Sequence, residues 1–310
     1  MLSTWDYFLC FFNTSVFLFG FCANIVIIFI IIKYHLLKHS SNVLILNLSI
    51  ADCLSLCRIP FLVTEQVLNH WPFGLILCKA YRSITLTASL TSCFSIILIT
   101  IERYFAVCHP LKVKKLHNRN FIIKCCSFCW VIAFVFRLPS VIYANLIAFT
   151  NEAANETCVK CVTEWPKNLK TPSIIVTIVI GFLIPCSLII FVYYKIITTL
   201  MRSKQFQTLW ASNSARNKRY KQITLLAFSI VASYLIFWIP YWTLKGITKV
   251  TSHDSDGIRM ALEFFSIFRF LHSATNPLLY FAFGPNFRKH LRKLCQKEMS
   301  QQQTLETVTY

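Results

Sequence analysis

Two runs of polar side chains repeat at helical spacing inside otherwise apolar segments. The runs consist of Arg82, Thr85, Ser89 and Ser92, and of Ser266, Arg269, Ser273 and Asn276. Residues three and four positions apart lie on one face of a helix, so each run predicts one polar stripe. Asp52 lies near the middle of a third apolar segment, and His272 lies beside the second stripe. Ionisable groups are costly in apolar surroundings, and they indicate a hydrated interior that serves a function.

The hydroxyl groups have a simpler alternative explanation. In a helix, Thr85 or Ser89 can bond to the backbone carbonyl four residues earlier and have no further role. That alternative does not explain Arg82, Arg269 or Asp52, because a buried charge needs a partner or water. These three charged residues therefore indicate a functional cleft.

The composition indicates which solvent surrounds these stripes. The 310-residue chain is 56% apolar and 14% charged, and its mean hydropathy is +0.57, whereas soluble domains carry about 25% charged residues. Lipid is therefore the expected solvent. The net charge of +19 does not indicate nucleic-acid binding, because the basic residues lie between long apolar runs and report membrane topology instead.

Seven apolar segments are long enough to cross a hydrocarbon core of about 30 Å. Their approximate bounds are Phe8–Ile32, Val43–Leu68, Leu77–Val107, Phe121–Tyr143, Ile174–Leu200, Ile223–Leu244 and Ile258–Phe283. Because every backbone group must be satisfied within lipid, the predicted fold is an all-α membrane protein, a bundle of seven transmembrane helices. The predicted order is a short extracellular N-terminus (1–7), the seven-helix domain (8–283), an amphipathic surface helix (284–297) and a disordered cytoplasmic tail (298–310).

Basic residues predict the orientation of the bundle. If the N-terminus is outside, one alternating set of loops, together with the surface helix, holds most of the 31 Lys and Arg residues and few acids. Cytoplasmic loops carry such an excess, so we expect a multi-pass plasma-membrane protein with an extracellular N-terminus. The sequons at Asn155 and Asn13 both fall on the outer side, and Asn155, in a polar loop, is the better glycosylation candidate. The basic inner face also suits anionic membrane lipids.

Short motifs in a fixed order resemble those of one receptor family. They are Gly20-Phe-Cys-Ala-Asn24, Asn47-Leu-Ser-Ile-Ala-Asp52, Glu102-Arg103-Tyr104, Phe237-Trp-Ile-Pro240 and Asn276-Pro-Leu-Leu-Tyr280. Along nearly its whole length the chain resembles the rhodopsin-like (class A) G-protein-coupled receptors. Three further segments are most similar to peptide receptors of the somatostatin, opioid, galanin and allatostatin group. These segments are His70-Trp-Pro-Phe-Gly74, Cys161-Val-Thr-Glu-Trp-Pro166 and Gly181-Phe-Leu-Ile-Pro185.

The resemblance implies roles for residues at the inner end of the bundle. Glu102 is expected to hold Arg103 at rest, and Arg103 is expected to receive a heterotrimeric G protein once the sixth helix moves outward. Tyr104, Tyr193 and Tyr280 complete the implied coupling surface. Without the flanking motifs, an ordinary interfacial ion pair would be the explanation for Glu102 and Arg103.

The resemblance also implies a switch in the middle of the bundle. Trp238, beside Pro240, is expected to couple ligand contact to the movement of the sixth helix. The residues that match the family's sodium and protonation pocket are Asp52, Ser92, Ser273 and Asn276. A sodium ion at Asp52 is therefore the one cofactor suggested. His272 stands where Asn is commoner, which leaves sodium binding or a proton-sensitive pair of His272 and Asp52 as alternatives.

The 14 cysteines predict one bridge and no metal site. An oxidising outer side favours a disulfide from Cys78 to the second outer loop. By the resemblance its partner is Cys161, which leaves Cys158 spare or paired with Cys10. Cys295 is the palmitoylation candidate. No nucleophile elbow, phosphate loop or dinucleotide fingerprint is present, so the chain is not expected to be an enzyme.

The outer mouth of the bundle is the expected ligand site. Its predicted contacts are Arg58, Arg82, Thr85, Ser89, Tyr241, Trp242, Lys245, Glu263, Ser266 and Arg269. Amine receptors have Asp at the position of Thr85, so the resemblance argues against an aminergic ligand. Guanidinium groups favour planar anions, which predicts a carboxylate or phosphate on the ligand. The alternative is that Arg82 pairs with Glu65 or Glu263.

The predicted function is a G-protein-coupled receptor for an extracellular, neuropeptide-like ligand with a basic portion near the acidic rim. An anionic lipid or small metabolite is the alternative ligand. A transporter or channel is a more remote alternative, because the two halves show no matching pair of broken helices.

Overall fold

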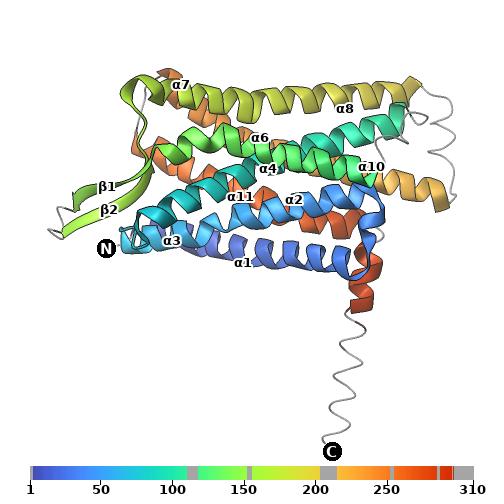
Figure 1. Ribbon diagram of the computed structural model, residues 1–310, viewed down its shortest axis with the longest axis horizontal. Helices are drawn as coiled ribbons and strands as arrows, with labels where there is room; N and C mark the ends of the chain where they lie inside the picture. The colour runs from blue at the N-terminus through green and yellow to red at the C-terminus, as the bar shows by residue number, and fades with distance from the viewer. Residues whose placement is uncertain are drawn as a thin grey trace, which may run out of the picture.

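The computed structural model describes residues 3–109, 118–151, 156–202, 215–251, 255–284, 287–294 and 296. Its long helices are α1 (Thr4–Lys33), α2 (Ser40–Leu56), α3 (Arg58–Leu68), α4 (Gly74–Cys108), α6 (Arg119–Ile142), α7 (Lys167–Ile178), α8 (Ile184–Arg202), α10 (Ala215–Thr251) and α11 (Asp256–Phe283). Figure 1 shows these helices running in one general direction, with a β-hairpin at one end of the bundle. We call this the hairpin end, and the other the basic end.

These helices form seven spans, because α2 with α3 and α7 with α8 are each one interrupted span. Within the described residues, six spans are long and apolar enough to cross a membrane. The seventh, α11, packs against α1, α2 and α10 and carries the charged residues Glu263 and Arg269. The predicted seven-helix bundle is confirmed.

The second span breaks at a proline. α2 ends at Leu56, because Pro60 has no N–H to donate to the carbonyl of that residue, and α3 begins at Arg58. The predicted single helix Val43–Leu68 is therefore interrupted. The break places Arg58 in the first turn of α3, where its side chain lines both cavities described below.

The fifth span, predicted as a single helix over Ile174–Leu200, contains a π-helical turn at Val179–Leu183. Pro185 follows this turn and cannot donate to the Gly181 carbonyl, which accounts for the irregular backbone at this point. A Cβ atom on Gly181 would lie 3.6 Å from Nη2 of Arg137. Gly181 therefore lies at an ordinary packing distance from an arginine of another span.

α1 begins at Thr4 rather than at the predicted Phe8. Ser3 Oγ accepts a hydrogen bond from the Asp6 backbone N–H (3.2 Å), and the Asp6 carboxylate accepts one from the Ser3 backbone N–H (2.9 Å). This capping box starts the helix early. The helix therefore begins four residues earlier than predicted, and Asp6 lies on it at the mouth of the bundle.

The loop between α6 and α7 adds a two-stranded hairpin to the predicted all-α bundle. β1 (Ala144–Asn151) pairs antiparallel with β2 (Glu156–Thr163). The Trp71 backbone N–H donates to the Val159 carbonyl (2.7 Å), so the first outer loop is attached to the hairpin. A two-stranded sheet is marginal alone, and its stability comes from such tertiary contacts, which helical periodicity does not reveal.

Motif asparagines join neighbouring spans. Asn24 Nδ2 donates to the carbonyls of Gly20 (2.8 Å) and Ser273 (2.9 Å), which ties α1 to α11. Asn47 accepts a hydrogen bond from Trp130 Nε1 (3.0 Å), which ties α2 to α6. Polar groups without water must be paired inside the bundle, so these bonds select one packing of the helices.

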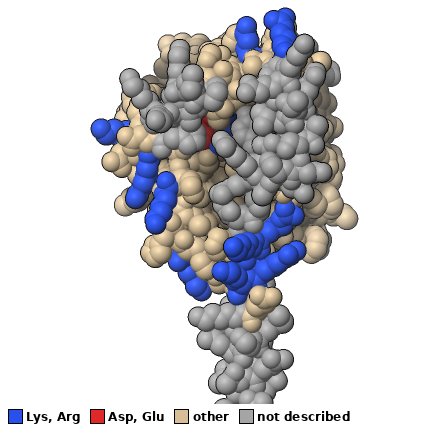
Figure 2. All heavy atoms as spheres, turned by 90° about the vertical axis from the view of Figure 1, so that its right-hand side faces the viewer, with Lys and Arg blue, Asp and Glu red and all other residues tan. Residues whose placement is uncertain are grey.

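The predicted amphipathic helix is confirmed over residues 287–294, which are helical. Phe287 is buried, with its ring centroid 5.9 Å from that of Tyr280. The exposed basic side chains are Arg288, Lys289, Arg292 and Lys293. Figure 2 views this basic end and shows clusters of Lys and Arg with little Asp or Glu. The predicted palmitoylation site Cys295 and the tail 298–310 lie outside the described residues.

Candidate functional site

Two adjoining cavities open at the hairpin end. The outer cavity has a volume of about 780 Å³ and is lined by α1, α3, α4, α11 and β2. The inner cavity has a volume of about 220 Å³ and lies between α3, α4, α6, α7, α10 and α11. Arg58 and Arg82 line both cavities and mark the boundary between them.

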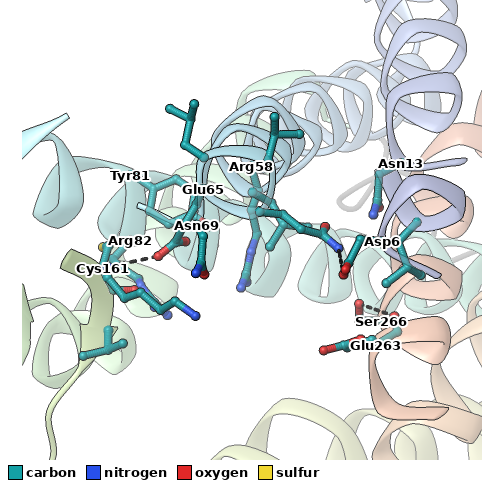
Figure 3. A pocket seen from close by; sticks show the side chains of 17 residues that line it. Asp6, Asn13, Arg58, Glu65, Asn69, Tyr81, Arg82, Cys161, Glu263 and Ser266 are labelled. Carbon is teal, nitrogen blue, oxygen red and sulfur yellow. Dashed lines mark hydrogen bonds between the residues drawn. The ribbon is translucent and has the colours of Figure 1, made fainter. Parts of the chain in front are cut away.

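Three carboxylates line the outer cavity, and each accepts a hydrogen bond from a neutral donor. Asp6 Oδ1 accepts one from Gln66 Nε2 (3.1 Å), and Glu263 Oε2 accepts one from Trp5 Nε1 (3.3 Å). Glu65 Oε1 accepts one from the Cys161 backbone N–H (3.1 Å). Figure 3 shows Asp6 and Glu263 on one side of the cavity and Glu65 with Arg82 on the other. These bonds orient the carboxylates without neutralising them.

The predicted alternative pairing of Arg82 with an acid is wrong in this structure. Arg82 Nη2 donates to the Cys161 carbonyl (2.6 Å), and neither Glu65 nor Glu263 forms an ion pair with it in the described part of the chain. Cys161 is joined to Cys78 of α4 by the predicted disulfide, and Cys158 is a free cysteine. The bridge therefore fixes the strand whose backbone holds both Arg82 and Glu65.

Five cations line the inner cavity. They are Arg58 of α3, Arg82 of α4, Arg137 of α6, Lys245 of α10 and Arg269 of α11. None of the described residues that line this cavity is Asp or Glu. The Nε atoms of all four arginines are buried and make no hydrogen bond in the described part of the chain.

Sequence analysis missed Arg137. It belongs to no polar stripe on its own helix, although the rule that selected Arg82, a cation within an apolar span, applies to it equally. Its Nη1 donates weakly to Thr177 Oγ1 (3.5 Å).

Aromatic rings support several of these cations. The Arg269 guanidinium carbon lies 3.8 Å from the centroid of the Tyr241 ring, and Lys245 Nζ donates to the Tyr241 hydroxyl (3.0 Å). The guanidinium carbons of Arg58 and Arg82 lie 6.0 and 5.9 Å from the centroid of the Tyr81 ring. These distances are near the outer limit of about 6 Å for a cation–π contact. The Tyr241 ring face therefore holds the Arg269 guanidinium, while its Nε has no hydrogen-bond partner in the described part of the chain.

Most predicted ligand contacts line one of the two cavities. Ser89, Tyr241, Trp242, Lys245 and Arg269 line the inner cavity, Glu263 and Ser266 the outer, and Arg58 and Arg82 both.

Thr85 is the exception, because it is buried and donates to the Tyr81 carbonyl of its own helix (2.6 Å). Thr85 therefore lines neither cavity, and the structure gives no support to its prediction as a ligand contact. Ser89 shares a hydrogen bond with Ser55 (2.8 Å) instead of bonding its own helix.

The four residues of the predicted ion pocket meet in the middle of the bundle. Asp52 Oδ1 accepts hydrogen bonds from Ser92 Oγ (2.8 Å) and Ser273 Oγ (2.9 Å), and Oδ2 accepts one from Asn276 Nδ2 (2.7 Å). All four are buried. Carboxylate and hydroxyl oxygens suit a hard cation, so these residues fit a sodium ion, which stays a prediction.

The predicted pair of His272 and Asp52 does not form. His272 is buried, and neither ring nitrogen makes a hydrogen bond in the described part of the chain. Its ring instead packs edge-on against Tyr234 (5.5 Å between centroids) and Trp238 (6.4 Å). The Asp52 carboxylate is already occupied by hydroxyl and amide donors.

Stacked aromatic rings connect the inner cavity to the middle of the bundle. Trp238 and Trp242 both line the cavity, with ring centroids 6.5 Å apart. Trp238 also contacts the Tyr234 ring (5.0 Å between centroids), which lies deeper and is fully buried. The three rings therefore form one packed column on α10 between the inner cavity and the middle of the bundle.

At the basic end, the Glu102–Arg103 ion pair is present and buried. Arg103 Nε donates to Glu102 Oε2 (2.7 Å), and Ser41 Oγ of α2 donates to Glu102 Oε1 (2.8 Å). Arg103 Nη2 also reaches Ser41 Oγ (2.7 Å). Burial and the third partner distinguish this latch from an ordinary interfacial pair. Sequence analysis missed Ser41, because nothing in its position along α2 marks it.

The predicted coupling tyrosines surround this latch in different settings. Tyr193 and Tyr280 are buried, and their hydroxyl groups have no hydrogen-bond partner in the described part of the chain. Tyr104 shares a weak hydrogen bond with His109 Nε2 (3.4 Å). The two buried hydroxyls are therefore free to gain partners in another arrangement of the helices.

The predicted glycosylation sites have different outcomes. Asn13 lies within α1, lines the outer cavity and is only 3% exposed. A bulky glycan does not fit there, so the structure contradicts the prediction at Asn13. Asn155 lies outside the described residues.

Together, the seven-helix fold, the cavity at one end and the latch at the other define a membrane receptor. A sequence profile described as "7 transmembrane receptor (rhodopsin family)" matches residues 23–280, and the chain belongs to this family. It is therefore a signalling receptor rather than an enzyme, and a multi-pass protein of the plasma membrane.

Among its relatives are somatostatin receptors. The chain is 29% identical to somatostatin receptor type 1 of Rattus norvegicus over 276 residues, which is 89% of this chain and 68% of the relative. It is 30% identical to somatostatin receptor type 4 of Rattus norvegicus over 278 residues, covering 89% and 69%. A G-protein coupled receptor E1 of Equine herpesvirus 2 (strain 86/87) is 29% identical over 288 residues, covering 89% and 70%.

Proposed function

We propose that this protein is a G-protein-coupled receptor whose peptide ligand occupies the two adjoining cavities. The observation that carries the proposal is the outer cavity of about 780 Å³ at the mouth of a bundle whose relatives are named as receptors for somatostatin. Ligand sites are clefts of about 300–1,000 Å³, so this volume suits part of a peptide. The relatives do not favour an anionic lipid, a metabolite, or a transporter or channel.

The ligand carries an anionic group that binds Arg58, Arg82 and Arg269. Support comes from the inner cavity, where these guanidinium groups meet no carboxylate among the described lining residues. Arginine presents planar donors that match a carboxylate or phosphate in bidentate geometry. Thr85, which is bonded to its own helix, supplies no negative charge for an amine.

The hairpin end faces the outside of the cell, and the N-terminus is therefore extracellular. The basic end supports this orientation, because positive charge gathers there and cytoplasmic surfaces carry such an excess. An epitope tag placed before residue 3 is expected to be accessible to antibody on intact cells. Staining that requires permeabilised cells would invert the orientation.

Occupancy of the cavities is transmitted to a heterotrimeric G protein through α10. Trp238 lines the inner cavity and packs on Tyr234, while Glu102 and Arg103 close the opposite end. Release of Arg103 supplies the surface for the G protein. A sodium ion held at Asp52 favours the closed arrangement, and anionic headgroups contact the exposed basic residues of 287–294.

The test is a screen of neuropeptides and anionic metabolites against membranes that contain the full-length chain and purified G proteins, with GTPγS binding as the readout. We expect a peptide agonist whose potency falls at least tenfold in Arg58→Ala, Arg82→Ala and Arg269→Ala variants. Lys167→Ala is the matched control, because this exposed cation lines neither cavity. Retained potency in all three arginine variants argues against the anionic contact.

A further inference from the structure

The two cavities differ in the sign of the charge that they leave unpaired. The inner cavity is lined by four arginines and a lysine and by no acid among its described residues. The outer cavity adds Asp6, Glu65 and Glu263, with Arg58 and Arg82 at its boundary and Lys160 on β2. A ligand that spans both therefore meets positive charge at its inner end and negative charge toward its outer end.

The inner cavity is unfavourable without a counterion. Four guanidinium groups from four helices converge on about 220 Å³, and like charges repel strongly where water is scarce. Arg82 contacts a backbone carbonyl and Arg137 a threonine hydroxyl. Arg269 lies over the Tyr241 ring, and Arg58 lies 6.0 Å from the centroid of the Tyr81 ring. None of these neutral partners offsets the charge, so one oxyanion bound among the arginines removes repulsion and satisfies free donors.

Arg137 closes the far side of this inner cavity. Arg58 and Arg82 also line the outer cavity, but Arg137 and Arg269 line the inner cavity alone. Gly181, in the π-helical turn, lies beside Arg137, since an added Cβ would stand at an ordinary contact distance of 3.6 Å from Nη2. An anion that contacts Arg137 has therefore passed the level of Arg58 and Arg82.

Two carboxylates of the outer cavity lie on the wall opposite Arg82. Asp6 of α1 and Glu263 of α11 face the cavity from neighbouring helices (Figure 3). Their hydrogen bonds come from Gln66 and Trp5, which are uncharged donors. In the described part of the chain neither acid forms an ion pair, so both remain available to a ligand cation.

We infer that the ligand is a bipolar peptide that binds with its acidic end innermost, among Arg58, Arg82, Arg137 and Arg269, and with a basic group in the outer cavity against Asp6 and Glu263. Arg137 is the specificity-determining residue that sets how deep in the inner cavity the acidic end of the peptide binds. This inference rests on the proposed function only in taking the two cavities as the ligand site, and its tests measure binding without a G protein.

The first test uses benzoate and its uncharged isostere benzamide with the purified full-length receptor in lipid nanodiscs. The thermal midpoint is followed by tryptophan fluorescence at constant ionic strength. Benzoate is expected to raise the midpoint by several degrees and benzamide by less than half as much. Arg137→Gln and Arg269→Gln are expected to remove most of the benzoate shift, while Arg137→Lys retains part of it and the surface control Lys167→Gln retains all.

Each shift is taken within one variant, so a change in basal stability does not affect it. If Arg137→Gln does not fold, Arg137→Lys and Arg269→Gln decide the outcome. Equal shifts from benzoate and benzamide overturn the inner anion site. A full benzoate response in Arg137→Gln overturns the inference that the acidic group binds as deep as Arg137. Where only Arg269→Gln folds, a full response in that variant overturns it.

The second test uses four acetylated tetrapeptides, Ac-Lys-Gly-Gly-Phe and Ac-Gln-Gly-Gly-Phe, each with a free carboxylate or a carboxamide. The lysine peptide with a free carboxylate is expected to give the largest shift. The combined Asp6→Asn and Glu263→Gln variant is expected to lose the advantage of lysine over glutamine and to keep the advantage of carboxylate over carboxamide. Glu164→Gln is the control, because this exposed acid lines neither cavity.

An equal response to lysine and glutamine peptides, or a lysine advantage that survives the combined variant, overturns the outer half of the inference. If agonists activate a G protein while benzoate and the tetrapeptides give no charge-dependent shift, the bipolar inference falls and the receptor function stands. If the shifts appear but no agonist activates a G protein, the proposed function falls instead.

Discussion

The two ends of the bundle treat charge in opposite ways. At the hairpin end, the described arginines of the inner cavity make no ion pair. At the basic end, Arg103 is paired with Glu102 and shares Ser41 as a third partner. One end therefore leaves its charges without an ionic partner, whereas the other pairs its charges within the bundle.

Removing the disulfide is expected to have the largest effect, because it disorganises the hairpin end. Cys161→Ser cuts the bridge to Cys78 and frees the strand that holds Arg82 and Glu65. Loss of such a bridge costs about 2–5 kcal/mol of stability. We expect a sharp fall in surface expression and thermal midpoint. Cys158→Ser is the control, and an equal fall in both variants would show that the bridge itself is unimportant.

Glu102→Gln is expected to open the basic end, because Arg103 then lacks an ionic partner as the arginines of the hairpin end do. A hydrogen bond between charged groups contributes about 1.5–3 kcal/mol, so its loss shifts the resting equilibrium roughly tenfold toward the open form. Basal GTPγS binding should rise accordingly without ligand. Ser41→Ala removes only the neutral member of the latch and leaves the ion pair in place, so basal binding should rise less than in Glu102→Gln. Unchanged basal binding in Glu102→Gln contradicts the latch.

Asp52→Asn tests whether the middle of the bundle links the two ends through an ion. The carboxylate accepts three hydrogen bonds from groups on α4 and α11, and a bound cation would hold those helices together. We expect basal GTPγS binding to be about fivefold lower in sodium than in potassium, at the low end of typical coupling, and Asp52→Asn to abolish the difference. Equal values for the unmodified receptor in both salts would exclude a sodium effect.

Thr85→Val is expected to have the smallest effect. The hydroxyl bonds the Tyr81 carbonyl of its own helix and lines neither cavity, so agonist potency should change by less than about twofold. Ser89→Ala provides the comparison, because Ser89 lines the inner cavity and should give the larger change. A larger loss of potency in Thr85→Val than in Ser89→Ala would show that Thr85, and not Ser89, lines the ligand site.

Helical spacing predicted which polar residues of one span share the same face of the helix. Spacing placed Ser92, Ser273 and Asn276 on two polar stripes, and the family resemblance implied that they share a pocket with Asp52. They meet around its carboxylate. Polar side chains are costly in lipid, so the polar face of each helix must point into the bundle. The sequence therefore predicts which face points inward before the packing of the helices is known. Of the polar stripes, only Thr85 turned out to bond its own helix instead of lining a cavity or the ion pocket.

Residues without a periodic signal could not be predicted in this way. Arg137 joins the inner cavity because α6 packs beside α4, and Ser41 joins the latch because α2 reaches under Arg103. His272 turned toward Tyr234 instead of Asp52, since rotation of a helix by a few tens of degrees decides which neighbour a side chain meets.

The amino-acid sequence by itself determined the solvent, the seven spans and the polar stripes, because hydrophobic length and helical period are local properties. Only the tertiary structure decided the hairpin, the broken spans and the separation of charge between two cavities. Each of these depends on groups far apart in the chain that meet once the helices have packed, and no local pattern records that meeting.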